Sequence, residues 1–214
     1  MKRNQVILIY GVPAAGKYTM AKKLSDEKGF LLDNHYFHDM FKNLTEVPEP
    51  RKKEYFDDVG SFKEVFLKII QKFYPKTEYV RYIFTACIAE DEKDNILTFQ
   101  KFADSIDADF IPIELKADIN VLKSRCQTDY RKWRKKISDP QKLECVINKT
   151  FQKSPDFEHE NKLIIESSFL NEEETFQIIK EFLKKFEWLQ KQKKHPQKGV
   201  FLLALKFKWW LHRF

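Results

Sequence analysis

A short glycine-bearing segment, residues 11–17 with the sequence GVPAAGK, constrains this 214-residue chain more than any other feature. It follows an apolar run at residues 5–10 that is typical of a central strand buried on both faces. After it, Met20, Ala21 and Leu24 lie at helical spacing. The segment is therefore predicted to form the loop between a strand and a helix.

A loop of this kind has a physical use, which is the binding of phosphate groups. Glycine adopts backbone angles that side chains forbid, so several N–H groups can turn inward and form a nest for phosphate oxygens. The helix that follows adds the positive end of its dipole, and Lys17 adds a point charge. The pattern predicts a nucleotide site; the simpler alternative is a tight turn with an exposed lysine. The predicted nucleotide contacts are Gly11, Pro13, Ala14, Ala15, Gly16, Lys17, Tyr18 and Thr19.

Tyr18 departs from the usual form of this motif, which has Ser or Thr directly after the lysine as a ligand of Mg²⁺. A tyrosine cannot place a short hydroxyl on the metal, and the next hydroxyl is that of Thr19. Two interpretations stay open: water and a carboxylate hold the magnesium, or the metal binds weakly.

The rest of the chain alternates between short apolar runs and helical patterns. This alternation predicts an α/β fold with a parallel sheet of five strands and helices on both faces. A basic loop is predicted at residues 129–138, and Asp118 and Asn171 are predicted to cap helices. The predicted strands are residues 5–10, 30–32, 79–85, 109–115 and 162–166, and the later helices are residues 51–73, 94–107, 118–128 and 140–151.

Ligands of such sheets bind at the carboxyl ends of the strands. The loop at residues 11–17, Asp33 and Thr85 all follow or end predicted strands, so we expect them to meet at one edge of the sheet. Asp33 has a simpler alternative role as the cap of a helix at residues 35–44.

Over residues 5–186 the chain resembles the P-loop kinases of small molecules and nucleotides, such as adenylate kinase, shikimate kinase and chloramphenicol phosphotransferase. The resemblance rests on the Walker A loop with Thr19, the Asn34-His35 pair, the segment IFTAC at residues 83–87, and a basic segment before Asp139-Pro140. It implies the three-layer P-loop fold, with a mobile lid at about residues 125–140. It also implies transfer of the γ-phosphoryl group of ATP, with Mg²⁺, to a hydroxyl or phosphate of a small acceptor.

The resemblance also assigns roles to single residues. Asp33 is expected to bind the acceptor, to accept its proton, or to hold Mg²⁺ through water, and Asn34 and His35 are expected to contact the acceptor. Two histidines at positions 35 and 38 without a third ligand are weak evidence for a metal. In the lid, Arg131 and Arg134 are expected to close over the transferring phosphoryl group, with Arg125 near the nucleotide, although a solvated basic helix face has the same composition.

Other P-loop classes fit less well. A GTPase needs Asn-Lys-x-Asp, whereas Phe151 ends the segment NKTF at residues 148–151. The strand at residues 83–87 also lacks the Asp-Glu end of a mechanical ATPase. Because Tyr18 leaves metal binding open, the alternative to a kinase is a nucleotide-binding regulatory module with little transfer activity, whose tail docks on a membrane or nucleic acid.

The net charge of +7 comes from the end of the chain, because residues 188–214 carry seven Lys and Arg side chains and no acidic residue. We therefore predict a kinase-like domain at residues 1–187 without a strong nucleic-acid signal, and a basic, aromatic tail at residues 188–214. The mixture of bases with aromatic residues predicts contact with a membrane surface or an acidic partner. Without a secretory signal, a membrane-spanning run or a disulfide pattern, the expected location is cytoplasmic.

Overall fold

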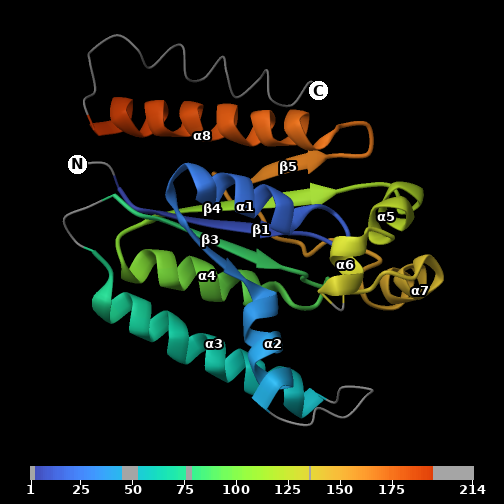
Figure 1. Ribbon diagram of the computed structural model, residues 1–214. Helices are drawn as coiled ribbons and strands as arrows, with labels where there is room; N and C mark the ends of the chain where they lie inside the picture. Colours follow the sequence, from blue (N-terminus) through green and yellow to red (C-terminus); the bar gives the residue numbers. More distant parts are fainter. Residues whose placement is uncertain (1–2, 45–52, 76–78, 135, 195–214) are drawn as a thin grey trace. The chain divides into compact units, whose positions relative to one another are not determined.

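The computed structural model describes residues 3–44, 53–75, 79–134 and 136–194. Its central sheet has the order β2-β3-β1-β4-β5, and all neighbouring strands are parallel (Figure 1). The predicted five-stranded parallel sheet is therefore confirmed. The strands are β1 (Gln5–Tyr10), β2 (Phe30–Asp33), β3 (Arg81–Ala86), β4 (Asp109–Lys116) and β5 (Leu163–Glu166).

The strand before the phosphate loop, β1, lies at the centre of the sheet because both of its faces are apolar and all six residues are buried. Tyr10, its last residue, pairs with Ala86 of β3 and Glu114 of β4. The prediction of a strand through Pro112 is correct. Pairing with β5 begins only at Ile113, so the missing N–H of Pro112 falls outside the stretch that is paired on both sides.

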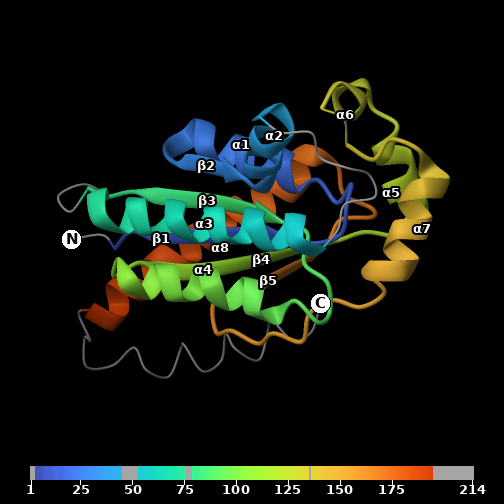
Figure 2. The ribbon, with the colours of Figure 1, turned by 90° about the horizontal axis from the view of Figure 1, so that it is seen from below.

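Helices cover both faces of this sheet (Figure 2). The helix after the phosphate loop, α1, packs on β3 and β2, and α4 packs on β1 and β4, with α3 against it. The helices are α1 (Lys17–Lys28), α2 (Asn34–Leu44), α3 (Lys53–Phe73), α4 (Lys93–Ser105), α5 (Ile119–Cys126), α6 (Asp129–Trp133), α7 (Pro140–Thr150) and α8 (Glu172–Lys194).

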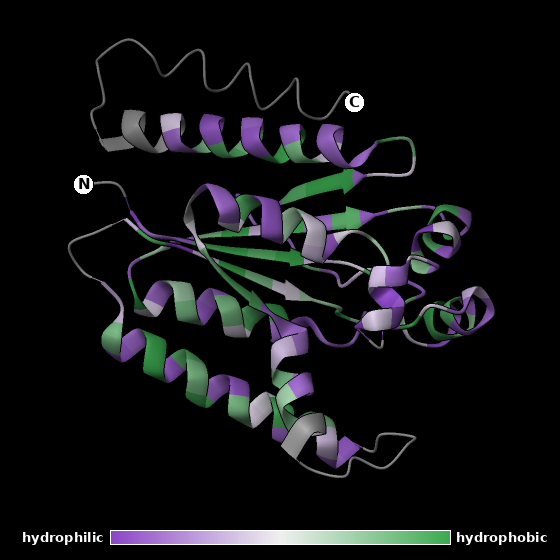
Figure 3. Ribbon diagram, viewed as in Figure 1, coloured by the Kyte–Doolittle hydropathy of each residue, from purple (hydrophilic) through white to green (hydrophobic). Residues whose placement is uncertain are grey.

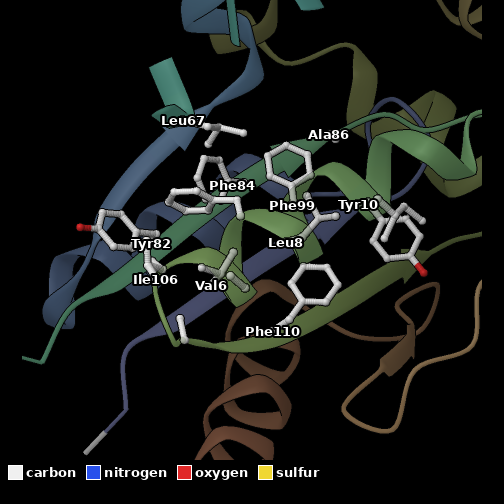
Figure 4. Packing of buried hydrophobic residues seen from close by; sticks show 14 of the residues in the cluster. Val6, Leu8, Tyr10, Leu67, Tyr82, Phe84, Ala86, Phe99, Ile106 and Phe110 are labelled. Atoms are coloured by element: carbon white, nitrogen blue, oxygen red, sulfur yellow. The ribbon is translucent and has the colours of Figure 1, made fainter. Parts of the chain in front are cut away.

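The core between the sheet and α4 is rich in aromatic rings (Figure 4). Alternate β1 residues, Val6, Leu8 and Tyr10, point into it, and the rings of Phe84 and Phe99 lie 4.8 Å apart. Figure 3 shows the strands as predominantly hydrophobic, whereas α3 and α4 alternate between apolar and polar residues. This pattern fixes the strand positions and thereby the place of the loops at their carboxyl ends.

Helix caps follow the sequence. Asp118 accepts a hydrogen bond from the Asn120 N–H at the start of α5, and Asn171 accepts one from the Glu174 N–H at the start of α8. Glu174 in turn accepts from the Asn171 N–H, which completes a capping box. Both predicted caps are confirmed.

The prediction of a basic loop at residues 129–138 is wrong in its first half, where the short helix α6 forms. The Thr128 carbonyl accepts hydrogen bonds from the N–H groups of Arg131 and Lys132, and Asp129 stands in the first turn. A helix of five residues is too short to show apolar periodicity, so nothing in the sequence marked it and its charged residues indicated a loop.

The chain divides into two compact units, residues 1–176 and 177–214. The predicted boundary at residue 187 lies inside α8. Residues 195–214, on which the predicted membrane or partner contact depends, lie outside the described residues. None of the described helices combines the length and apolar composition that crossing a membrane requires.

Candidate active site

The loop between β1 and α1 has the backbone that a phosphate nest requires. Gly11, Ala14 and Gly16 have φ values of 145°, 68° and 93°, so three of the six residues at positions 11–16 have positive φ. Gly16 stands at the N-terminus of α1, where the first N–H groups of the helix have no intrahelical acceptor. The loop therefore presents main-chain donors at the positive end of a helix dipole.

The two glycines of the loop are needed for different reasons. A Cβ at Gly11 would collide with the Leu115 carbonyl oxygen of β4, and the φ of 145° is strained for any L side chain. A Cβ at Gly16 would meet nothing within 4 Å, so only its φ of 93° favours glycine. Gly11 thus allows the loop to approach the sheet closely, whereas Gly16 only turns the chain.

Lys17 folds back over this loop. Its Nζ donates hydrogen bonds to the carbonyl oxygens of Gly11 (2.9 Å) and Val12 (2.7 Å). The ammonium group is thereby held at the mouth of the nest, where it can exchange carbonyl oxygens for phosphate oxygens with little movement.

Asp33 ends β2 at the same edge of the sheet, with β3 between β2 and β1, and is almost fully buried. Its Oδ1 accepts a hydrogen bond from Thr85 Oγ1 (2.5 Å) and lies 3.4 Å from His35 Nδ1. Its Oδ2 accepts no hydrogen bond and lies 3.7 Å from Lys136 Nζ. One carboxylate oxygen is therefore fixed and the other is available.

The environment of Asp33 keeps this carboxyl group ionised. Burial by itself would raise the pKa of Asp33, but interactions with His35, Thr85 and the charge of Lys136 outweigh it and hold the pKa well below its usual range. Burial also lowers the pKa of Lys136, and Asp33 acts in the opposite direction. The carboxylate therefore stays charged at neutral pH.

Tyr18, which stands where the usual motif has Ser or Thr, makes contacts that the sequence did not predict. Its ring stacks on Tyr130 of α6, with centroids 5.6 Å apart, and Lys136 Nζ lies 4.9 Å from the Tyr18 centroid. The residue in the position of the usual metal ligand thus contacts α6 and the residues after it. Burial and the neighbouring Tyr18 raise the pKa values of Tyr130 and Tyr36.

Arg134 lies against α2. Its Nη2 is 3.0 Å from Asp39 Oδ2, and its guanidinium lies 5.9 Å from the ring of Tyr36 and 5.8 Å from that of Trp133. Figure 2 shows α6 beside α2, which agrees with these contacts. Arg134 therefore joins the C-terminal end of α6 to α2, the helix that begins after Asp33.

The other predicted arginines have local partners. Arg131 donates to the Ile137 carbonyl through Nε (3.0 Å) and Nη2 (2.8 Å), which links α6 to the chain that follows it. Arg125 donates to Ser167 Oγ and to the carbonyls of Ser167 and Leu170, in the loop after β5. Arg125, which was expected near the nucleotide, thus holds the loop after β5.

The structure brings together Lys17, Asp33, Asn34, His35 and Arg134 at the carboxyl edge of the sheet. The Asn34 N–H donates to Thr85 Oγ1 (3.4 Å), and Thr19 lies in the first turn of α1. Two further members of the site, Asp39 and Tyr130, were not singled out from the sequence, and Lys136 was indicated only as one residue of the basic segment before Asp139. No spacing rule marks them, because each reaches the site only through the packing of α6 against α2 and α1.

Metal ligands are sparse in the part of the chain that the structure describes, where no group of three His, Cys, Asp or Glu side chains could hold an ion. The free Oδ2 of Asp33 fits a water molecule bound to Mg²⁺, a cation that keeps several waters and takes few protein ligands.

The sequence matches no protein-family model, and no curated protein matches it. Its structure is similar to that of a candidate kinase from Chloroflexus aurantiacus, with a TM-score of 0.58 and 18% identity over 84% of this chain and 98% of the other. For a gluconokinase from Sinorhizobium meliloti the TM-score is 0.54 and the sequence identity is 9%, over 91% of this chain and 100% of the other. For an APS kinase from Mycobacterium tuberculosis, in complex with AMPPNP and APS, the TM-score is 0.51 and the sequence identity is 12%, over 86% of this chain and 99% of the other. The chain has the P-loop kinase fold.

Proposed function

We propose that this protein is a phosphotransferase that moves the γ-phosphoryl group of ATP to a hydroxyl group of a small acceptor. The observation that carries the proposal is the free Oδ2 of Asp33, a buried and ionised oxygen at the carboxyl edge of the sheet that also bears the phosphate loop. A nucleotide-binding module without transfer activity would have no need for such a group.

In this proposal the loop at residues 11–16 and Lys17 hold the phosphates of ATP, with Thr19 in the first turn of α1. The acceptor hydroxyl donates its hydrogen bond to Asp33 Oδ2, and Asn34 and His35 contact the acceptor. The acceptor oxygen forms a bond to the γ-phosphorus, the bond from that phosphorus to the β–γ bridging oxygen breaks, and ADP leaves. The hydroxyl proton passes to the Asp33 carboxylate.

Positive charge from the lid accompanies this transfer. Lys136 is the lid cation whose contact with Asp33 supports a place at the reacting groups. Arg131 and Arg134 are proposed to stabilise the transferring phosphoryl group when the lid closes on ATP. Mg²⁺, held through water by Asp33, would neutralise the donor phosphates.

The contact between Tyr18 and the lid leads to a prediction with a matched pair of variants. Tyr18→Phe keeps the ring that stacks on Tyr130. The variant therefore retains the roughly 0.5–1.5 kcal/mol that such a pair of rings contributes, and we expect its activity to lie within about threefold of the wild type. Tyr18→Thr removes the ring and supplies the short hydroxyl of the usual motif. It should lower the Mg²⁺ concentration for half-maximal activity and raise the KM for the acceptor. Steady-state kinetics at varied Mg²⁺ checks both; equal acceptor KM values in the two variants would contradict the assigned role.

The proposed function is tested by Mg²⁺-dependent ADP release from ATP with a panel of hydroxyl acceptors. The panel holds sugars, nucleosides, nucleoside monophosphates, hydroxy acids and aminoglycosides. We expect one class to stimulate turnover and Lys17→Ala to abolish it. Lys22→Ala, which removes an exposed cation of the same helix, serves as the control. ATP binding without stimulation by any acceptor would favour the nucleotide-binding module instead.

A further inference from the structure

The ammonium group of Lys136 is buried without a hydrogen bond. The side chain is 8% exposed, and no described residue accepts a hydrogen bond from its Nζ. The carboxylate oxygen paired with it, Asp33 Oδ2, lies 3.7 Å away and itself has no hydrogen-bond partner. An ammonium group carries three donors, and donors left unfilled in a buried place indicate a ligand that supplies acceptor oxygens.

Two aromatic rings hold this ammonium group in place. Tyr18 of α1 and Tyr130 of α6 stack with their centroids 5.6 Å apart, and Lys136 Nζ lies 4.9 Å from the first centroid and 5.9 Å from the second. The negative face of an aromatic ring attracts a cation at this distance without accepting a conventional hydrogen bond from it. The rings therefore determine where the ammonium group lies and leave its donors free.

The charges around Lys136 favour an incoming anion. Burial lowers the pKa of Lys136, Asp33 acts in the opposite direction, and the positive charges of Arg131, Arg134 and Lys17 lower the pKa further. Positive charge is therefore crowded together in a place of low exposure. A negatively charged ligand beside Lys136 would relieve this repulsion and would hold the lysine in its charged form.

The neighbours of Lys136 indicate which phosphate group this ligand would present. Asp33 Oδ2 is the proposed acceptor of the hydroxyl proton, and Lys17 belongs to the phosphate loop. In the proposed reaction the γ-phosphoryl group lies between the acceptor oxygen and ADP. A cation that is paired with Asp33 and feels the charge of Lys17 is therefore placed for the γ-phosphate, which ATP carries and ADP lacks.

We propose that Tyr18 is a positioning residue, whose ring holds Lys136 Nζ where it donates hydrogen bonds to the γ-phosphate of bound ATP. The inference rests on the proposed function and gives a role to the residue that stands where the usual motif has Ser or Thr. The ring of Tyr130 completes the contact from α6. Lys136 is thus the side chain that distinguishes ATP from ADP. Once it donates to the phosphate, Asp33 Oδ2 is open to the acceptor hydroxyl.

The test is a double-mutant cycle on nucleotide binding, which needs no acceptor. Calorimetry on the whole chain with Mg²⁺ gives the Kd of AMPPNP, which has a γ-phosphate, and the Kd of ADP. The variants are Tyr18→Leu, Lys136→Met and the two combined, and Tyr18→Phe keeps the ring while removing the hydroxyl group. Lys132→Met is the matched control, because Lys132 is an exposed lysine of α6 paired with Asp129. Because ADP binding reports an intact phosphate loop, the ratio of the two Kd values is insensitive to a general loss of folding.

We expect the wild type to prefer AMPPNP to ADP. Lys136→Met should reduce this preference by about 10–100-fold, the effect of one charge-assisted hydrogen bond, and Tyr18→Leu by about 2–30-fold, the range of a cation–π contact. The combined variant should lose no more than Lys136→Met alone, because the ring acts through the lysine. Tyr18→Phe and Lys132→Met should keep the preference of the wild type.

An unchanged preference in Lys136→Met would overturn the inference while leaving the proposed function intact. Additive losses in the combined variant, or a Tyr18→Phe variant that behaves like Tyr18→Leu, would overturn the positioning role of the Tyr18 ring. The expected pattern of binding without turnover on any hydroxyl acceptor would refute the proposed function and uphold the roles of Tyr18 and Lys136 in nucleotide binding. A wild type that binds neither nucleotide would overturn both.

Discussion

Asp33→Asn is expected to lower kcat by about 10²–10⁴-fold, the usual contribution of a positioned proton acceptor, with little change in the KM for ATP. The amide keeps the size of the carboxylate and can still accept from Thr85, but it cannot take the proton of the acceptor hydroxyl. Steady-state kinetics with the preferred acceptor checks this. Asp26→Asn, on the exposed face of α1, is the control and should retain wild-type rates.

The pH dependence of kcat/KM tests the role of Asp33 a second time. Because the interactions with His35, Thr85 and Lys136 outweigh burial and hold the pKa of Asp33 below its usual range, the acid limb of kcat/KM should lie below that of an ordinary carboxylate. Lys136→Met removes a positive charge, so the pKa of Asp33 should rise and the limb should move to higher pH. An Asp33→Asn variant with full activity would refute the role of Asp33, and an unmoved limb in Lys136→Met would refute the coupling.

Gly11→Ala is the second change with a large expected effect. It combines a positive φ with a collision against the Leu115 carbonyl, so we expect a loss of about 2–5 kcal/mol in the free energy of unfolding and loss of ATP binding. Gly16→Ala, in the same loop, meets no neighbouring atom and should cost only about 1–2 kcal/mol. Urea unfolding of both variants measures the difference. Equal losses would mean that the approach of the loop to β4 does not matter.

Local features of the chain were predictable because short-range physics determines them. The loop at residues 11–17 and its flanking strand and helix follow from glycine placement and apolar spacing. The position of Asp33 at the carboxyl edge follows from strand order alone, since parallel strands end together.

Contacts between distant segments could not be predicted. Tyr18 was an unexplained departure from a motif, and its reason, Tyr130, is more than a hundred residues away. Lys136 and Asp39 are ordinary charged residues in the sequence, and only the packing of α6 against α2 gives them partners. Arg131 and Arg125 also have backbone acceptors that no charge pattern indicates, at Ile137 and in the loop after β5.

The binding of ATP to the loop at residues 11–17 is the central claim, and calorimetric titration of the whole chain with ATP and Mg²⁺ tests it most directly. We predict saturable binding to the wild type and to Lys22→Ala. Lys17→Ala should bind about 10–100-fold more weakly, which corresponds to the loss of a charge-assisted hydrogen bond of about 1.5–3 kcal/mol. No binding to the wild type, or equal affinity of Lys17→Ala, would contradict the account.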